Sequence, residues 1–210
     1  MVKGFIFDLG NVLINFDHNI AVSRIAPLIK NMDSEYIYNL FFDSDLTRSF
    51  EEGKIMPFEF YMEVKKRLNC EISYDEFVKI WNEIFYFSEE NALILSLAQE
   101  LNKKFPILVL SNINKLHYDY LKEKYYFIFD FTYKILSFEM NMVKPHPSIY
   151  KRALAFLGTK PDETIYIDDR KDLIEAAGKL GLYAVQFKNT KDIFDRINIL
   201  GIDVRSPFVN

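Results

Sequence analysis

The sequence contains a single cysteine, Cys70, among its 210 residues. An internal disulfide is therefore excluded, and one cysteine is typical of a chain from a reducing compartment. No run of about 20 apolar residues is present, which a membrane-spanning helix would require. The apolar segment after Lys3 is interrupted by Asp8, and no small-residue cleavage site of a secretory signal follows it. These absences predict a cytoplasmic protein with no membrane partner.

An excess of basic residues is also lacking. The chain has 26 lysines and arginines against 30 aspartates and glutamates, which gives a formal net charge of −4. Nucleic acid is therefore not an expected partner. Half of the residues are hydrophobic and 16% are aromatic, which is enough apolar surface for a packed core and argues against disorder. No internal repeat or low-complexity segment is present.

The pattern of apolar residues divides the chain into three parts. A short apolar strand comes first, and a long helical stretch follows it, with apolar residues at helical spacing. After Pro106 strands alternate with helices. The predicted strands cover residues 3–8, 107–110, 133–136, 164–167 and 183–187. The predicted helices that follow Pro106 cover residues 114–125, 147–157, 171–180 and 190–200.

Short, fully apolar strands that alternate with helices predict a parallel sheet with helices on both faces. We therefore expect an α/β fold with a Rossmann-like core formed by residues 1–15 and 104–210. Residues 16–103 are expected to form an all-helical cap domain inserted after the first strand. Because open α/β sheets bind ligands at the carboxyl ends of their strands, this insertion is expected to cover the ligand site.

Polar residues end the first two apolar strands of the core. Asp8 follows the first, and a buried carboxylate in such a place commonly holds a metal or acts as a nucleophile. Ser111 and Asn112 end the second, where a hydroxyl, an amide and the N–H groups of a helix start can bind an anion. For each site the alternative is an ordinary helix or turn cap.

Two further strand ends carry charged residues. Lys144 precedes Pro145, which holds the backbone extended, so its ammonium group can neutralise phosphate or pair with a carboxylate. Asp168 and Asp169 are adjacent at the end of a buried strand and repel each other unless a cation or donor lies between them. Carboxylate ligands of this kind favour Mg²⁺. A surface lysine and a helix-capping aspartate are the alternatives.

In this order, these residues resemble the four motifs of the haloacid dehalogenase superfamily of phosphatases, and the resemblance covers essentially the whole chain. The segments Phe7–Val12 and Ser111–His117 are, more narrowly, similar to bacterial α-D-glucose-1-phosphate phosphatases. The amino-terminal phosphatase domain of soluble epoxide hydrolases is a more distant likeness. The resemblance implies a Mg²⁺-dependent phosphatase that acts on a small phosphorylated metabolite, such as a sugar phosphate.

The resemblance also implies roles for individual residues. Asp8 attacks phosphorus to form an aspartyl-phosphate, while Ser111 and Lys144 bind and neutralise the phosphate oxygens. The other implied roles are metal binding by Asp8, Gly10 and Asp169, substrate binding by Asn11 and Asn112, the latter with nearby backbone N–H groups, and orientation of the site by Asp168.

The sequence departs from the family pattern at two positions. Gly10 stands where most phosphatases of this superfamily have an aspartate that protonates the leaving group, a contribution worth about 10²–10⁴-fold in rate. Leu173 stands where an Asp or Asn usually supports the lysine, and Asp172 is a possible substitute although it faces about 100° away on a helix. A metal-independent 2-haloacid dehalogenase and a non-catalytic binding protein are therefore the alternative functions.

The cap offers candidates for substrate contacts. These are the segments Phe16–His18 and Phe50–Gly53, although both phenylalanines are equally consistent with a cap core. Glu51 is the candidate to replace the acid missing at Gly10. His117 matches the glucose-1-phosphatase pattern, with packing as its alternative role. The sequence does not predict an oligomeric state.

Overall fold

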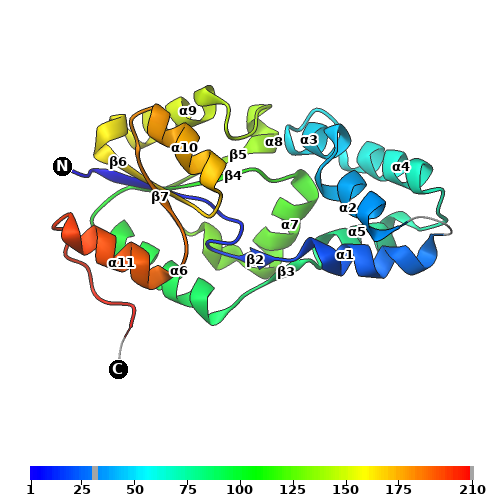
Figure 1. The fold of residues 1–210 in the computed structure, drawn as a ribbon, viewed down its shortest axis with the longest axis horizontal. Coiled ribbons are helices and arrows are strands. Elements are labelled where there is room, and N and C mark those ends of the chain that lie inside the picture. Colours follow the sequence, from blue (N-terminus) through cyan, green and yellow to red (C-terminus); the bar gives the residue numbers. More distant parts are fainter. Residues whose placement is uncertain (30–32, 209–210) are drawn as a thin grey trace.

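A five-stranded parallel sheet forms the centre of the core domain (Figure 1). The computed structural model describes residues 1–29 and 33–208. The strand order is β5-β4-β1-β6-β7, so β1 lies in the middle between β4 and β6. The strands are β1 (Gly4–Phe7), β4 (Ile107–Ser111), β5 (Tyr133–Leu136), β6 (Thr164–Asp168) and β7 (Tyr183–Gln186).

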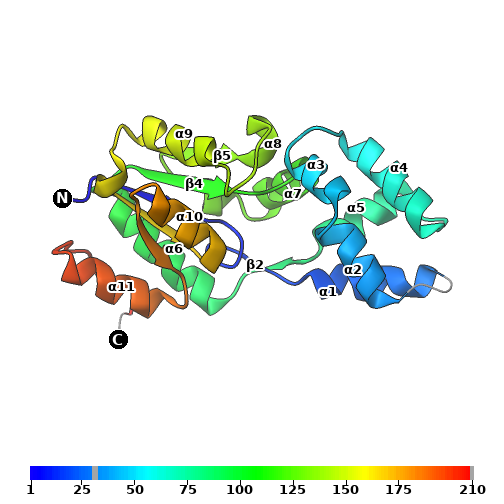
Figure 2. The same cartoon turned by 45° about the horizontal axis from the view of Figure 1, so that its top comes forward.

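Helices cover both faces of this sheet, as the apolar strands require. Alternate strand residues point to opposite faces. Phe5 and Phe7 pack with α6, α7 and α11, whereas Ile6 packs with α9 and α10. Figures 1 and 2 show α9 and α10 on one side of the sheet and α6 and α11 on the other. The core helices are α6 (Glu89–Asn102), α7 (Lys115–Lys124), α8 (Ser137–Met140), α9 (Pro147–Leu157), α10 (Lys171–Lys179) and α11 (Thr190–Ile199), with 3₁₀ turns η2 (Tyr126–Phe129) and η3 (Pro161–Glu163).

Five helices after β1 pack around a second, separate hydrophobic cluster that contains Trp81. They are α1 (His18–Ile25), α2 (Ser34–Phe42), α3 (Asp45–Glu51), α4 (Pro57–Leu68) and α5 (Tyr74–Asn82), with the 3₁₀ turn η1 (Ala26–Leu28). They lie beyond the carboxyl ends of the strands (Figure 2). The predicted helical insertion is therefore present in the position that covers the strand ends.

The chain passes between the two clusters twice, and the two crossings pair with each other. β2 (Asn15–Phe16) leads into the helical cluster, and β3 (Phe85–Tyr86) leads out of it. The two form an antiparallel ribbon in which Asn15 lies opposite Tyr86 and Phe16 lies opposite Phe85. The helical cluster is thus joined to the core through a single two-stranded ribbon.

The predicted strands and helices of the core are confirmed to within about two residues, the uncertainty that element ends usually carry. One expectation is wrong. Residues 16–103 were expected to form the helical insertion, but α6 packs on the sheet through residues such as Leu97 and Leu101, which are fully buried. The apolar spacing of α6 is that of any amphipathic helix, and it does not specify the surface against which the helix packs. Across the described part of the chain, no helix has the length and apolar character needed to span a bilayer.

Candidate active site

The carboxyl ends of three neighbouring strands bring the predicted site residues together. Phe7, the last residue of β1, lies opposite Val109 of β4 on one side and Ile167 of β6 on the other. Because these strands run parallel, the residues that follow them meet at one edge of the sheet. Asp8 therefore lies between Ser111 and Asp168, as the sequence predicts, and all three side chains are buried.

Lys144 connects Asp8 to Asp168. Its Nζ donates hydrogen bonds to Asp8 Oδ1 at 2.7 Å, to Asp168 Oδ2 at 2.8 Å and to the carbonyl oxygen of Leu110 at 3.1 Å. These three acceptors match the three N–H donors of an ammonium group. Burial alone would lower the pKa of Lys144, but the attraction of the two carboxylates outweighs it and keeps the pKa above its usual value. Lys144 is therefore a buried, charged and rigidly held cation.

The backbone of Lys144 is held by Asn112. Asn112 Oδ1 accepts a hydrogen bond from Lys144 N at 2.7 Å, and Asn112 Nδ2 donates one to Lys144 O at 3.0 Å. The Lys144–Pro145 peptide bond is cis. Asn112 also lines the cavity, so its predicted substrate contact stays a prediction, while its amide is engaged in positioning the lysine. A substrate contact from the backbone N–H groups near Asn112 stays a prediction.

Asp168 uses both of its oxygens inside the protein. Oδ2 accepts from Lys144 and from the hydroxyl of Tyr166, and Oδ1 accepts from the backbone N–H of Arg170 at 2.9 Å. Asp168 is also fully buried. These contacts fit the predicted orienting role, since a carboxylate so engaged holds Lys144 in place and has little capacity left for a ligand.

Asp8 and Asp169 are the carboxylates that remain for a cation. One oxygen from each of Asp8, Asp168 and Asp169 lies within 4.8 Å of the other two. Burial raises the pKa of Asp8 to about 7 even though Lys144 lowers it, and burial and the charge of Asp168 raise the pKa of Asp169. One lysine thus faces three carboxylates, and this excess of buried negative charge favours a divalent cation. Gly10, the third predicted metal ligand, lines the same cavity.

Asn11 and Gln186 hold Asp169 in place. Asn11 Nδ2 donates to Asp169 Oδ2 at 3.2 Å, and Gln186 Nε2 donates to the Asp169 carbonyl at 2.9 Å. Asn11 also lines the cavity, so its predicted contact with substrate stays a prediction. Gln186 was not predicted, because a glutamine at the end of an edge strand carries no signal of its partner.

A family model for haloacid dehalogenase-like hydrolases matches residues 2–181 of the chain. The chain belongs to this family. It is 23% identical over 206 residues to the D-ribitol-5-phosphate phosphatase of Bacteroides thetaiotaomicron, which covers 95% of this chain and 98% of that protein. A sesquiterpene phosphatase of Aspergillus oryzae is 24% identical over 189 residues, which covers 90% of this chain and 91% of that protein.

The fold of the chain is also similar to solved structures of this family. A haloacid dehalogenase family enzyme from Bacteroides thetaiotaomicron superimposes with a TM-score of 0.78 at 26% identity, covering 90% of this chain and 95% of that chain. Its crystal structure is a complex with magnesium and inorganic phosphate. Family membership therefore establishes a hydrolase, and the likeness extends to a relative that holds the predicted cofactor.

The contacts around Gly10 explain why this chain lacks the aspartate that most phosphatases of the family carry at this position. A Cβ atom built on Gly10 would lie 2.7 Å from Cε1 of Phe16 and 3.3 Å from its Cδ1. Gly10 is not among the residues with positive φ, so its backbone does not itself require glycine. The ring of Phe16 therefore has to shift before a side chain fits at this position.

The other departure from the family pattern is at Leu173, which lines the cavity without a polar contact to offer. Asp172, the possible substitute, pairs with Arg170 at 2.7 Å on the exposed surface and does not support Lys144. This idea is wrong because consecutive helix residues point in different directions. Asp168 and Asn112 support Lys144 instead.

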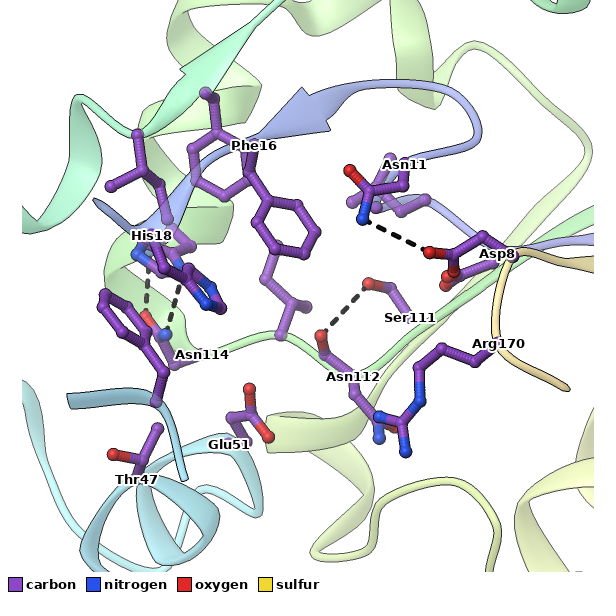
Figure 3. A pocket seen from close by; sticks show the side chains of 18 of the residues that line it. Asp8, Asn11, Phe16, His18, Thr47, Glu51, Ser111, Asn112, Asn114 and Arg170 are labelled. Atoms are coloured by element: carbon purple, nitrogen blue, oxygen red, sulfur yellow. Dashed lines mark hydrogen bonds between the residues drawn. The ribbon is translucent and has the colours of Figure 1, made fainter. Parts of the chain in front are cut away.

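Aromatic side chains of the helical cluster form the opposite wall of the cavity, whose volume is about 380 Å³ (Figure 3). His18 stacks on Phe42 with ring centroids 3.6 Å apart and planes at 3°. Burial lowers the pKa of His18 to about 4, so this ring is neutral at neutral pH. The aromatic residues and histidines of this wall are Phe16, His18, Tyr38, Phe42, Trp81, Phe85 and His117.

His117 joins the helical cluster to the core. Its Nε2 donates to the Trp81 carbonyl at 3.0 Å, and its Nδ1 accepts from Asn114 Nδ2 at 3.0 Å. Burial lowers the pKa of His117 to about 3, which keeps the ring neutral in this tautomer. The contacts of His117 are therefore those of a packing residue, the alternative role given for it from the sequence.

Some residues of the segment Phe50–Gly53 pack inside the helical cluster, and others line the cavity. Phe50 is buried in the helical cluster, and Glu52 pairs with Lys54 at 2.5 Å. Glu51, the last residue of α3, lines the cavity with Thr47, and both rise from the side opposite Asp8 (Figure 3).

Proposed function

We propose that the protein is a Mg²⁺-dependent phosphatase that removes phosphate from a small phosphorylated metabolite through an aspartyl-phosphate on Asp8. The observation that carries this proposal is the cluster of buried Asp8, buried Asp168 and half-buried Asp169, in which Lys144 pairs with Asp8 and Asp168. Curated relatives that are named phosphatases support the same reaction.

The described residues fit a Mg²⁺ ion. The donor set contains oxygen only, with Asp8, Asp169 and the Gly10 carbonyl as the groups that would hold the ion, and Mg²⁺ accepts one or two carboxylates together with water. When bound, the ion supplies neutralisation of charge on the transferring phosphoryl group. Asp168 is not needed as a ligand, because Lys144, Tyr166 and Arg170 satisfy its oxygens.

The protein groups perform the remaining chemistry. Asp8 Oδ1 is held by Lys144 at 2.7 Å, which leaves Oδ2 to attack phosphorus in line with the departing oxygen. Ser111 Oγ and the backbone N–H groups of the loop before α7 bind phosphate oxygens, and Lys144 balances their charge. The leaving group then lies toward the helical cluster. We propose that this cluster, residues 17–84, is a cap that covers the site and excludes water.

The substrate class follows from the two walls of the cavity. The phosphate binds at the sheet edge, and the leaving group lies against aromatic rings such as Trp81 and Phe42. Rings of this kind pack against the C–H faces of a sugar or polyol. A D-ribitol-5-phosphate phosphatase among the relatives supports a sugar or sugar-alcohol phosphate. Because the one cysteine, Cys70, is free and buried, we place the enzyme in the reducing cytoplasm.

The test of this function is hydrolysis of p-nitrophenyl phosphate with Mg²⁺, with EDTA, and with Asp8→Asn. We expect activity that requires both the metal and Asp8. Activity that survives in EDTA or in Asp8→Asn would contradict the mechanism. Release of chloride from 2-chloropropionate without metal would instead support the dehalogenase alternative, and ligand binding without turnover of either compound would support a non-catalytic protein.

Metal binding has a test that does not depend on turnover. Mg²⁺ at about 100 times its Kd stabilises the protein by about 2.7 kcal/mol if it binds only the folded state. We expect Asp169→Asn to lose most of this stabilisation in thermal unfolding. Asp172→Asn is the matched control, because Asp172 is exposed and pairs with Arg170. Equal stabilisation of both variants would show that the ion binds elsewhere.

A further inference from the structure

Gly10 leaves the reaction without the acid that most phosphatases of this superfamily carry there, so the proton comes from water or from another group on the cavity wall. The carboxylic acids among the described residues that line the cavity are Asp8, Asp169 and Glu51. Asp8 and Asp169 belong to the nucleophile and metal centre. The two histidines of the wall have lowered pKa values and are neutral at neutral pH, which makes them poor acids.

We infer that Glu51 is the general acid and base of the reaction, replacing from the cap the acid that Gly10 lacks. This inference rests on the proposed phosphatase function. It assigns a catalytic role to a residue of the inserted helices, on the side of the cavity where the leaving group lies.

The position of Glu51 supports this role. Its side chain points from the end of α3 toward the middle of the cavity, across from Asp8 (Figure 3). Within residues 1–29 and 33–208, no group donates a hydrogen bond to its carboxylate, in contrast to Asp168, whose oxygens are engaged. An acid that transfers protons needs such a free position.

The backbone of Glu51 is held against the core, which fixes the position of its carboxyl group relative to the phosphate site. Ser137 Oγ donates to the Glu51 carbonyl at 2.7 Å and also accepts from Ile113 N at 2.9 Å, in the loop that follows Ser111. Two residues further along, Gly53 has a φ of +67°, and a Cβ there would lie 2.1 Å from the Phe138 carbonyl oxygen. The end of α3 is thus in direct backbone contact with the core.

The surroundings of Glu51 match the protonation state that the role needs. Burial raises its pKa to about 7, while Arg170 and Lys144 lower it and Glu52 raises it. Near neutral pH the group therefore exists both as acid and as base. Enzymes that raise a glutamate into this range use it for general acid–base catalysis.

The two chemical steps balance with Glu51 alone. In the first, Asp8 bonds to phosphorus, the bond to the leaving oxygen breaks, and that oxygen takes the proton from the Glu51 carboxylic acid. In the second, the Glu51 carboxylate takes a proton from water. The water oxygen bonds to phosphorus, and the bond between phosphorus and Asp8 breaks. Phosphate is released, and Glu51 is protonated again for the next cycle.

The experiment compares Glu51→Gln with Glu52→Gln on two substrates. Glu52 is a matched control because it is the next residue, of the same type, and its carboxylate pairs with Lys54 and Arg48. The substrates are p-nitrophenyl phosphate, whose leaving group departs without a proton, and the best alkyl phosphate substrate of the wild type. Rates of the first turnover and of steady-state turnover are measured by rapid mixing.

We expect Glu51→Gln to lose about 10²–10⁴-fold in first-turnover rate on the alkyl phosphate, the usual contribution of a general acid. On p-nitrophenyl phosphate the same variant should keep a fast first release of p-nitrophenolate. Later turnovers should be slow, because no base activates the water that hydrolyses the phosphoenzyme. Glu51→Asp, which keeps the acid, should retain more activity than Gln. Glu52→Gln should keep the wild-type rates on both substrates at its optimum pH, with that optimum shifted to lower pH because the Glu52 charge no longer raises the pKa of Glu51.

Two results would overturn the inference. In the first, Glu51→Gln matches Glu52→Gln on the alkyl phosphate. In the second, Glu51→Gln loses the first turnover equally on both substrates, which indicates substrate binding and not proton transfer. If circular dichroism shows that Glu51→Gln disturbs the fold, Glu51→Met, which also lacks an acid, gives the same comparison. Failure of the phosphatase function itself is seen separately, as wild-type hydrolysis of p-nitrophenyl phosphate that does not need Asp8.

Discussion

Replacing Gly10 by aspartate would restore the acid that most family members have, and the structure predicts what happens. The new Cβ would lie 2.7 Å from Cε1 of Phe16, closer than such contacts allow. The ring cannot move freely, because it packs against His18 with centroids 4.7 Å apart and against Phe85 at 6.1 Å. Overpacking of this kind costs about 1–3 kcal/mol. We therefore expect Gly10→Asp to lower the free energy of unfolding by about this amount, without a gain in turnover.

Removing the ring should relieve the strain. Phe16→Ala alone is destabilising, because it deletes packing. In the Phe16→Ala background, however, Gly10→Asp should cost less than in the wild type, with a coupling energy of about 0.5–3 kcal/mol. Urea denaturation of the four proteins measures this cycle. Gly178→Ala is the control for losing a glycine, since a Cβ built there meets no described atom within 4 Å outside its chain neighbours and its own helix backbone, and it should stabilise by about 0.4–1 kcal/mol.

The double variant also tests the chemistry. With space beside position 10, the aspartate should raise turnover of an alkyl phosphate above that of Phe16→Ala alone. An equal cost of Gly10→Asp in both backgrounds would refute the steric account of Phe16. A well-folded double variant without any gain in turnover would show that an acid at position 10 does not serve this site.

Three other outcomes are expected. Lys144→Met should lower the free energy of unfolding by about 3–5 kcal/mol in urea, because it leaves buried carboxylates unpaired; an unchanged midpoint would contradict the buried ion pair. The pKa of His117 is lowered from 6.5 to about 3, so between these values the unfolded chain binds more protons, and stability falls as the pH falls, by up to about 1.4 kcal/mol per pH unit. His117→Phe should reduce this slope between pH 7 and pH 5, and an unaltered slope would assign it to other groups. Gly158→Ala should lower the free energy of unfolding by about 1–2 kcal/mol, because its backbone is left-handed. Gly53→Ala should lower it further and also reduce activity, because the new Cβ would lie 2.1 Å from the Phe138 carbonyl oxygen. If the two variants lost the same stability and the same activity, this contact would not hold the cap.

The sequence predicts those parts of the fold that local patterns specify. Apolar strands alternating with helices predict the parallel sheet, and the polar residues after them predict which side chains meet at its edge. Asp8, Ser111 and Asp168 are brought together for this reason, since the ends of parallel neighbouring strands must meet. Lys144 was also expected at a strand end, but it lies beyond α8, in the loop before α9, and Asn112 holds it beside the other three.

Contacts that depend on the packing of distant segments were not predictable. The amides of Asn11 and Asn112 could serve a ligand or another residue equally well, and only the folded chain shows that they hold Asp169 and Lys144. The ring of Phe16 over Gly10 is a contact of the same kind. The packing of α6 was missed because an amphipathic helix specifies a buried face but not its partner.

The ribbon of β2 and β3 determines how the two parts of the molecule can change independently. Both crossings of the chain leave the core at one place and are hydrogen-bonded to each other, so they bend or twist as a unit and cannot separate one at a time. Residues between them that do not contact the core can be altered without changing the order of the strands, whereas the end of α3 and Trp81 are held to the core by Ser137 and His117. The wall that contacts the leaving group can therefore diversify in evolution, while the edge that binds phosphate stays constant.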